Sequence, residues 1–362
     1  MGSQKGSESY QAFPMNGGDG QHSYAQNSTN QRRGTDSAKN IINETILEKL
    51  NLETHLQNSS HTFRIADLGC SVGPNTFFTV QNIIEPVNLK YQSQEEYTTD
   101  SVEFQVFFND HVGNDFNTLF KSLPEDKQYF AAAMPGSFHG RLFPESSIHV
   151  FNSSYTLHWL SKVPKEIVDK NSRMYNKGKI YFTSEDKEVA EAYSAQFERD
   201  LESFLNSRVL ELVPGGIMIL IICCVPPNAL NSFQTSINIM GNVLAEMANK
   251  GLLSEELVDS FNIPIYVPTS EEARESIKKN GNFKIVKSEF LFRLMNSEYQ
   301  RDAHSSSMHF RAALEGVFKE HFEHEIVDDM FVQLEKRLAS EASILTDPRY
   351  KELGELLILK RN

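Results

Sequence analysis

Short apolar segments alternate with longer amphipathic segments over the first 225 residues of the chain. Each apolar segment ends in a turn or loop, and together they span residues 62–67, 102–108, 129–134, 147–152 and 217–225. Nearly continuous apolar strands that alternate with helices are typical of a parallel sheet covered by helices on both faces. The pattern therefore predicts an α/β fold with a mostly parallel sheet.

Apolar residues at helical spacing predict the helices between these strands. Thr35 or Asp36 is expected to cap a helix that runs to Leu50, and a second long helix is predicted over residues 189–212. Residues 355–360 are expected to form a terminal strand.

The last third of the chain does not continue the alternation. Residues 228–275 and 305–343 are predicted to be mostly helical and to form a cap over the carboxyl edge of the sheet, where open α/β sheets bind ligands. The polar residues 1–12 are expected to be disordered. The α/β core then spans residues 13–227 and is continued by 276–304 and 344–362.

Composition and charge exclude several classes of protein. The 362 residues include 35 Lys and Arg against 48 Asp and Glu, a net charge of −13, without a basic patch of the kind that binds nucleic acid. The apolar stretch 217–225 is about half as long as a membrane-spanning helix. The N-terminus lacks a signal-peptide pattern, and the three cysteines show no CxxC spacing. We therefore expect a cytoplasmic protein without a nucleic-acid or membrane partner.

A glycine-containing loop follows the first predicted strand. The sequence Asp67-Leu-Gly-Cys-Ser-Val-Gly73 lies between a strand and a helix, where glycines let a ligand approach the backbone. Asp110 ends the next strand, where a carboxylate can bind the two hydroxyls of a ribose. Nucleotide, flavin and adenosyl ligands all use such loops, and Asp110 could alternatively cap a helix. GxxxxGK[ST] is absent, so a P-loop is excluded.

Further motifs occur in order along the chain from about Phe13 onwards. They are Asn16-Gly-Gly-Asp-Gly-Gln-His-Ser-Tyr-Ala-Gln-Asn-Ser28, Pro74-Asn75, Asn109-Asp110, Pro135-Gly-Ser-Phe138, Arg141-Leu-Phe-Pro144 and Ser154-Tyr-Thr-Leu-His-Trp159. Together with the Asp67 loop they resemble the plant SABATH methyltransferases. This family includes carboxyl methyltransferases related to the salicylic, jasmonic, loganic and farnesoic acid enzymes, and N-methyltransferases of the caffeine pathway. The resemblance implies a Rossmann-like class I methyltransferase core and S-adenosylmethionine (SAM) as methyl donor.

The resemblance also implies roles for individual residues. Gln31, His158 and Trp159 are expected to act in catalysis by holding the substrate carboxylate. The residues expected around SAM are Tyr24, Ser28, Asp67, Gly69, Cys70, Asn75, Asp110, His111, Ser137 and Phe138. The residues expected around the substrate are Gln31, Tyr155, His158, Trp159, Ile237, Ile265 and Phe310, with Leu294 as a further wall residue.

Two of these residues could alternatively have a purely structural role, Trp159 as a core aromatic residue and His158 as a core histidine. Asn176, Asp259, Phe261 and Asn262 match positions where some family members are assigned Mg²⁺, although one carboxylate with carbonyl ligands is a poor magnesium site and surface-loop roles are the alternative. The resemblance further implies a homodimer.

A carboxylate is already ionised at neutral pH, so the proposed reaction needs no general base. Ile237 and Ile265 replace polar residues of the loganic acid enzyme, and an apolar lining rejects a sugar-bearing acid. A small, largely apolar acid, terpenoid or aromatic, is therefore the predicted substrate. The alternatives are N-methylation of a purine-like or pyridine nitrogen, and a non-catalytic acid-binding protein.

Overall fold

The computed structural model describes most of the chain. The described residues are 13–52, 62–93, 102–183, 185–225, 229–291, 302–341 and 353–362. Residues 1–12, for which the sequence predicted disorder, lie outside these ranges. So does Leu294, which was expected at the pocket wall.

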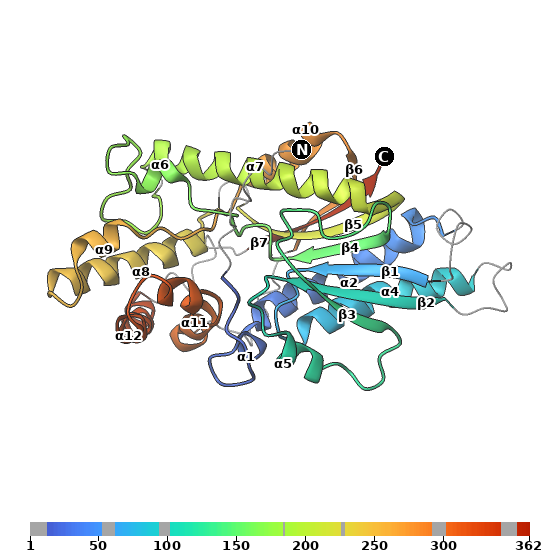
Figure 1. Cartoon of the computed structure of the whole chain (residues 1–362), viewed down its shortest axis with the longest axis horizontal. Coiled ribbons are helices and arrows are strands. Elements are labelled where there is room, and N and C mark those ends of the chain that lie inside the picture. Colours follow the sequence, from blue (N-terminus) through green and yellow to red (C-terminus); the bar gives the residue numbers. More distant parts are fainter. Residues whose placement is uncertain are drawn as a thin grey trace, which may run out of the picture.

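Seven strands form one sheet at the centre of the molecule (Figure 1). The strands follow the order β3-β2-β1-β4-β5-β7-β6, in which β7 is antiparallel to both of its neighbours and the other pairs are parallel. The carboxyl ends of β1 to β6 therefore meet at one edge, and the predicted α/β class is confirmed. The strands are β1 (Thr62–Leu68), β2 (Glu103–Asp110), β3 (Phe130–Pro135), β4 (Ile148–Ser154), β5 (Leu212–Cys224), β6 (Phe283–Leu291) and β7 (Leu353–Arg361).

Helices cover both faces of the sheet, as the apolar strands require. On β5, Ile219 packs into the cluster that holds α2 (Thr29–Lys49) and α4 (Asn75–Gln92), whereas Leu220 packs into the cluster that holds α7 (Lys187–Glu211) and α10 (Ser270–Asn280). Both side chains are fully buried, and each such burial contributes about 1.5–3 kcal/mol. Alternate residues of one strand thus hold the two helical layers together.

The helix α2 begins earlier than its apolar pattern predicts. It starts at Thr29, so Thr35 and Asp36 lie inside it rather than at its cap. The first two turns are polar because they face the ligand pocket and the surface rather than the core: Gln31 lines the pocket, and Arg32 lies over the ring of Phe78 at 3.3 Å. The periodicity therefore marked the core-facing part of the helix only.

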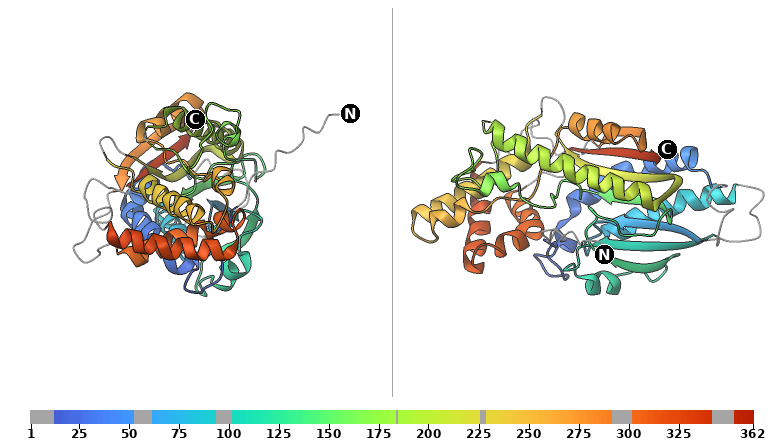
Figure 2. Two further views of the ribbon diagram at one scale, coloured as in Figure 1. Left: turned by 90° about the vertical axis from the view of Figure 1, so that its left-hand side faces the viewer. Right: turned by 45° about the horizontal axis from the view of Figure 1, so that its top comes forward.

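Four helices gather at the end of the molecule beyond the carboxyl edge of the sheet (Figures 1 and 2). They are α8 (Ser232–Asn249), α9 (Glu255–Asp259), α11 (Ala303–Lys319) and α12 (His324–Ser340). The boundary expected at residue 275 falls inside α10, which packs on α7 and β6 rather than on these four helices. In the described part of the chain, no helix combines the length and apolarity needed to cross a membrane. The short helices are α1 (Tyr24–Asn27), α5 (Phe116–Lys121) and α6 (Lys165–Val168).

Candidate active site

A pocket opens where the carboxyl ends of the strands meet α8 and α11. It contains about 1370 Å³ of space, part of it open to solvent. Its strand-end wall is formed by residues Gly69, Ser71, Asp110, His111, Phe138, Ser154, Tyr155, Thr156, Cys223 and Cys224.

The loop after β1 approaches the pocket with its backbone. Gly69 has φ 82°, and a Cβ there would lie 2.3 Å from the methyl carbon of Thr156. The amides of Gly69 and Cys70 both donate to the carbonyl of Asn109, at 2.8 and 2.9 Å. These bonds fix the loop against the end of β2, and any larger residue at position 69 would displace it.

Asp110 lies at the pocket wall at the end of β2. Its carboxylate accepts the N–H of Ser71 at 2.7 Å and the N–H of His111 at 2.7 Å. Burial raises the pKa of Asp110, and the two backbone N–H groups oppose this shift. Each oxygen retains a second lone pair that can accept a ligand hydroxyl. Asp115, not Asp110, is the helix cap here, because its side chain accepts the N–H of Thr118 at the start of α5.

The expected acid-binding residues converge on the other half of the pocket. Gln31 from α2 and Tyr155, His158 and Trp159 from the segment after β4 all line it. Trp159 pairs with Ile265 in an isolated antiparallel bridge, and the N–H of Tyr266 donates to the carbonyl of His158 at 2.8 Å. The segment that leads from the end helices into α10 therefore fixes the two consecutive residues His158 and Trp159.

The imidazole of His158 is neutral. Burial, with a smaller contribution from nearby His309, lowers its pKa to about 4. A ring with this pKa carries almost no charge at neutral pH. The His158 ring can therefore shape the pocket and hydrogen-bond a ligand, but it does not offer a positive charge to a carboxylate.

Comparison with known proteins identifies the family of the chain. The family model described as "SAM dependent carboxyl methyltransferase" matches residues 10–362. The chain belongs to this family. Loganic acid O-methyltransferase of Catharanthus roseus is 45% identical over 97% of this chain and 95% of that protein. Farnesoic acid carboxyl-O-methyltransferase of Arabidopsis thaliana is 44% identical over 76% of this chain and 78% of that protein.

A solved structure agrees with the sequence match. The structure titled "Loganic acid methyltransferase with SAH" covers 96% of this chain and 99% of its own, with a TM-score of 0.90 at 44% sequence identity. The predicted SABATH membership, the class I methyltransferase fold and the use of SAM are confirmed. The protein is a SAM-dependent methyltransferase that acts on a carboxylic acid.

Several residues expected around SAM lie behind the pocket wall of this methyltransferase. The carboxylate of Asp67 accepts the amide N–H of Asn152 at 2.6 Å and the hydroxyl of Thr76, and burial raises the pKa of Asp67 to about 6. The amide of Asn75 donates to the carbonyl and the hydroxyl of Ser28, at 3.1 and 3.0 Å. These groups tie the glycine loop to β4 and to the start of α2.

Two other expected SAM-site residues also lie off the pocket wall, beside residues that line it. Cys70 is buried next to Ser71, and Ser137 precedes Phe138 in the loop after β3. The remaining expected SAM-site residues all line the pocket, namely Tyr24, Gly69, Asp110, His111 and Phe138.

His309 is a pocket residue that sequence reasoning did not identify. Its Nδ1 lies 2.9 Å from the carbonyl of Asn27, and a carbonyl can only accept, so Nδ1 carries a proton. Its Nε2 lies 3.5 Å from the amide nitrogen of Gln31, and Oε1 of Gln31 is buried without a hydrogen-bond partner. The sequence offered one signal, a histidine directly before the expected wall residue Phe310.

Much of the pocket wall is apolar. Ile265 and Phe310 lie there as expected. Ile237 does not, because it is fully buried in the core one helical turn beyond Phe233, and it is Phe233 that lines the pocket. The apolar side chains that line the pocket include Phe13, Met15, Phe233, Ile265, Val267, Phe310, Ala313 and Leu314.

The four residues considered for magnesium lie together outside this pocket. The amide of Asn176 donates to Oδ1 of Asn262 at 2.7 Å, and the N–H of Gly178 donates to Oδ1 of Asp259 at 2.7 Å. The ring of Phe261 packs against the rings of Phe318 and Phe322. A single carboxylate with amide and carbonyl oxygens is a poor magnesium site. This donor set does not fit a magnesium ion, and we derive no step through one.

Proposed function

We propose that this methyltransferase esterifies a small, largely apolar organic acid, terpenoid or aromatic, and releases its methyl ester and S-adenosylhomocysteine (SAH). The observation that carries the proposal is the apolar lining that Phe233, Ile265 and Phe310 give to the pocket that also holds Gln31 and Trp159. A sugar-bearing acid would leave its hydroxyls without partners against these side chains. Each such unpaired group costs about 1–3 kcal/mol.

The residues at the strand ends fit the adenosyl part of SAM. Asp110 offers carboxylate lone pairs to the ribose hydroxyls, the Gly69 loop lines the pocket, and Phe138 offers an aromatic wall to the adenine. When bound, SAM supplies an electrophilic methyl group. The chain's own part is to hold the acid so that one carboxylate oxygen lies in line with that methyl.

The acid half of the pocket is suited to orienting a carboxylate. The substrate acid, with a pKa of about 4, is ionised at neutral pH and needs no proton acceptor. Gln31 and Trp159 both carry N–H donors that can bind it without being consumed. Orientation of two reactants can lower a barrier by several kcal/mol, so positioning accounts for catalysis here.

The proposal is tested by the acceptor preference of the purified protein. With labelled SAM, a farnesoic-type or benzoic-type acid should show a higher kcat/KM than loganic acid. Changing Phe233 to Ala should narrow that preference, whereas Leu252→Ala, at an exposed position beyond α8, serves as control. A wild-type preference for loganic acid would refute the apolar substrate class while leaving the methyltransferase assignment intact.

We also propose that the protein is a cytoplasmic homodimer. None of its three cysteines, all in the described part of the chain, forms a disulfide, and two of them are buried, which suits a reducing compartment. The β3 strand is an edge of the described sheet, and its Phe130 is 63% exposed, so this edge offers apolar surface to a second copy. Light scattering of the purified chain distinguishes a dimer from a monomer.

A further inference from the structure

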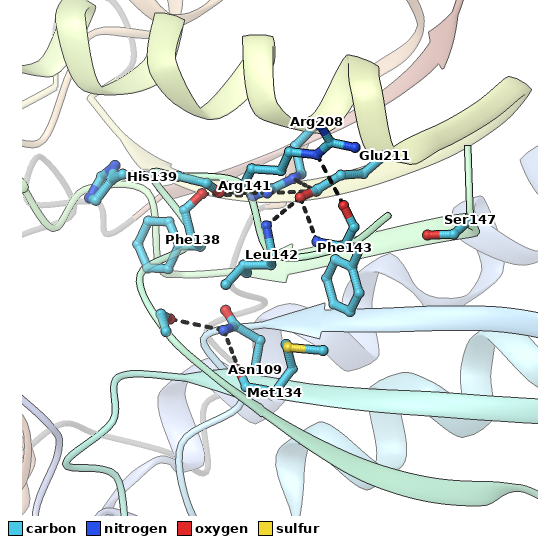
Figure 3. Close-up of polar contacts among 12 residues, drawn as sticks. Asn109, Met134, Phe138, His139, Arg141, Leu142, Phe143, Ser147, Arg208 and Glu211 are labelled. Carbon is cyan, nitrogen blue, oxygen red and sulfur yellow. Dashed lines mark hydrogen bonds and ion pairs between the residues drawn. The ribbon is translucent and has the colours of Figure 1, made fainter. Parts of the chain in front are cut away.

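A fully buried ion pair on α7 lies behind the loop that carries Phe138 (Figure 3). Nη2 of Arg208 lies 2.6 Å from Oε2 of Glu211, and both side chains are 0% exposed. Burying two charges has a large desolvation cost, which is offset only where good geometry and additional hydrogen bonds satisfy both groups. The additional partners of this pair are all backbone groups of one loop.

Arg208 binds two carbonyls of the loop after β3. Its Nη1 donates to the carbonyl of Phe138 at 2.7 Å, and its Nη2 donates to the carbonyl of Gly140 at 2.8 Å. The guanidinium is planar and rigid, so its donors hold the two carbonyls at a defined separation. One α7 side chain thereby sets the path of residues 138–140.

Glu211 binds two N–H groups further along the same loop. Its Oε1 accepts the N–H of Leu142 and, at 2.8 Å, the N–H of Phe143. The hydroxyl of Ser203, also on α7, donates to the carbonyl of His139 at 2.9 Å. The last turns of α7 thus bind nearly every residue from 138 to 143 by its main chain.

The opposite side of the loop is fixed to β2, next to Asp110. The amide of Asn109 donates to the carbonyls of Met134 and Gly136, at 2.6 and 2.9 Å, and the N–H of Gly136 donates to the carbonyl of Asp110 at 2.9 Å. The loop therefore spans from the ribose-binding carboxylate to the ion pair. Its position sets the distance between Asp110 and Phe138.

We propose that Arg208 and Glu211 are positioning residues of the SAM site. They hold Phe138 at the adenine side of the pocket while Asp110 holds the ribose, and so they set the affinity for the adenosyl group without touching it. This inference rests on the proposed adenosyl-binding roles of Asp110 and Phe138. Loss of the pair frees the loop and weakens binding of any ligand that carries adenosine.

Calorimetry with SAH and with adenosine tests this role in the full chain. Arg208→Met removes the hydrogen bonds to both carbonyls and should lower the affinity for SAH about tenfold. The affinity for adenosine should fall by the same factor, because the lost contacts concern only the adenosyl part of the site. Arg208→Lys keeps a positive charge beside Glu211 but lacks the planar set of donors of a guanidinium. It should lower the affinity for both ligands about threefold. Binding is measured below the unfolding midpoint of each variant.

Leu338→Ala is the control for general loss of stability, because it opens a cavity under α12, at the far end of the molecule. It should lower the midpoint but leave SAH affinity within about twofold. Wild-type affinity in folded Arg208→Met, or in Arg208→Lys should the Met variant not fold, would overturn the proposal. So would an equal loss of affinity in Leu338→Ala. A wild-type chain that does not bind SAH would instead refute the adenosyl site itself.

Discussion

Asp110 lies at the pocket wall, and its carboxylate accepts the backbone N–H groups of Ser71 and His111. A ribose diol would complete its hydrogen bonds. Charged hydrogen bonds of this kind contribute about 1.5–3 kcal/mol each, so Asp110→Ala should weaken SAH binding at least about tenfold. Asp126→Ala, at an exposed position, should leave the affinity unchanged in the same calorimetric experiment. Unchanged affinity in folded Asp110→Ala would remove this residue from the site.

His158 should make the protein less stable in acid. Its pKa in the folded state is about 4, below the value of about 6.5 in an unfolded chain, because burial disfavours the charged ring. Its stabilising contribution is therefore complete above pH 6.5 and is lost as the pH falls through 4. The full effect is on the order of 3 kcal/mol.

Denaturant unfolding between pH 7 and pH 4 measures this contribution. His158→Phe should flatten the decrease in unfolding free energy, whereas His324→Asn, at an exposed position, should not. A His158 ring that becomes protonated near pH 6.5 in an NMR titration would contradict the assigned pKa.

At the scale of elements, α2 and β7 approach the ring of Tyr155 through glycines. A Cβ at Gly34 would lie 1.7 Å from the Tyr155 hydroxyl, and one at Gly354 would lie 2.9 Å from it. Tyr155 itself has φ 57°, so its backbone is held in an uncommon conformation. Closely packed glycines thus let two elements meet beside the acid-binding residues.

Gly34→Ala should therefore displace Tyr155 and reduce methyl transfer about tenfold or more, since small misplacements in an active site have large effects. Gly20→Ala is the matched control, because a Cβ there meets no atom within 4 Å. The double change Gly34→Ala/Tyr155→Leu should recover the stability lost in the single variant. Full activity in Gly34→Ala would show that the Tyr155 position is not needed.

The contacts around Asn176, Asp259 and Asn262 lead to a prediction about metal removal. Oδ1 of Asn262 accepts the amide N–H of Asn176, and Oδ1 of Asp259 accepts the N–H of Gly178. These hydrogen bonds can hold the segments together without an ion. Treatment with EDTA should change neither the melting temperature nor the SAH affinity. A lower melting temperature that added Mg²⁺ restores would show that the site binds metal.

Across the whole molecule, the parts of the pocket that sequence predicted best are the strand ends. Apolar strands end abruptly at polar residues such as Asp110, and parallel strands bring their ends to one edge. The helical wall was harder to predict. Ile237 was expected at the wall from the resemblance to the loganic acid enzyme, but the structure places Phe233, one turn earlier on α8, at the pocket.

His309 also could not be predicted from the local sequence, because the residue that it meets lies far away along the chain. It meets Gln31 from α11, 278 residues further along the chain. Local pattern contains no information on such a contact, which depends on how the end helices pack over the sheet. The motifs of the family identified Gln31 and Trp159 as site residues. Their own sequence pattern would have placed Gln31 on the surface of a helix and Trp159 in the core.

The central claim is carboxyl methylation, and the chemical lability of the product tests it most directly. The purified protein is incubated with methyl-labelled SAM and either an apolar carboxylic acid, its primary amide, or a xanthine, and each product is then treated with mild alkali. Esters release labelled methanol, whereas N-methyl groups stay attached. We predict label that depends on the free acid and is fully released by alkali. Alkali-stable label on the xanthine or the amide, or no transfer to any acid, would contradict the account.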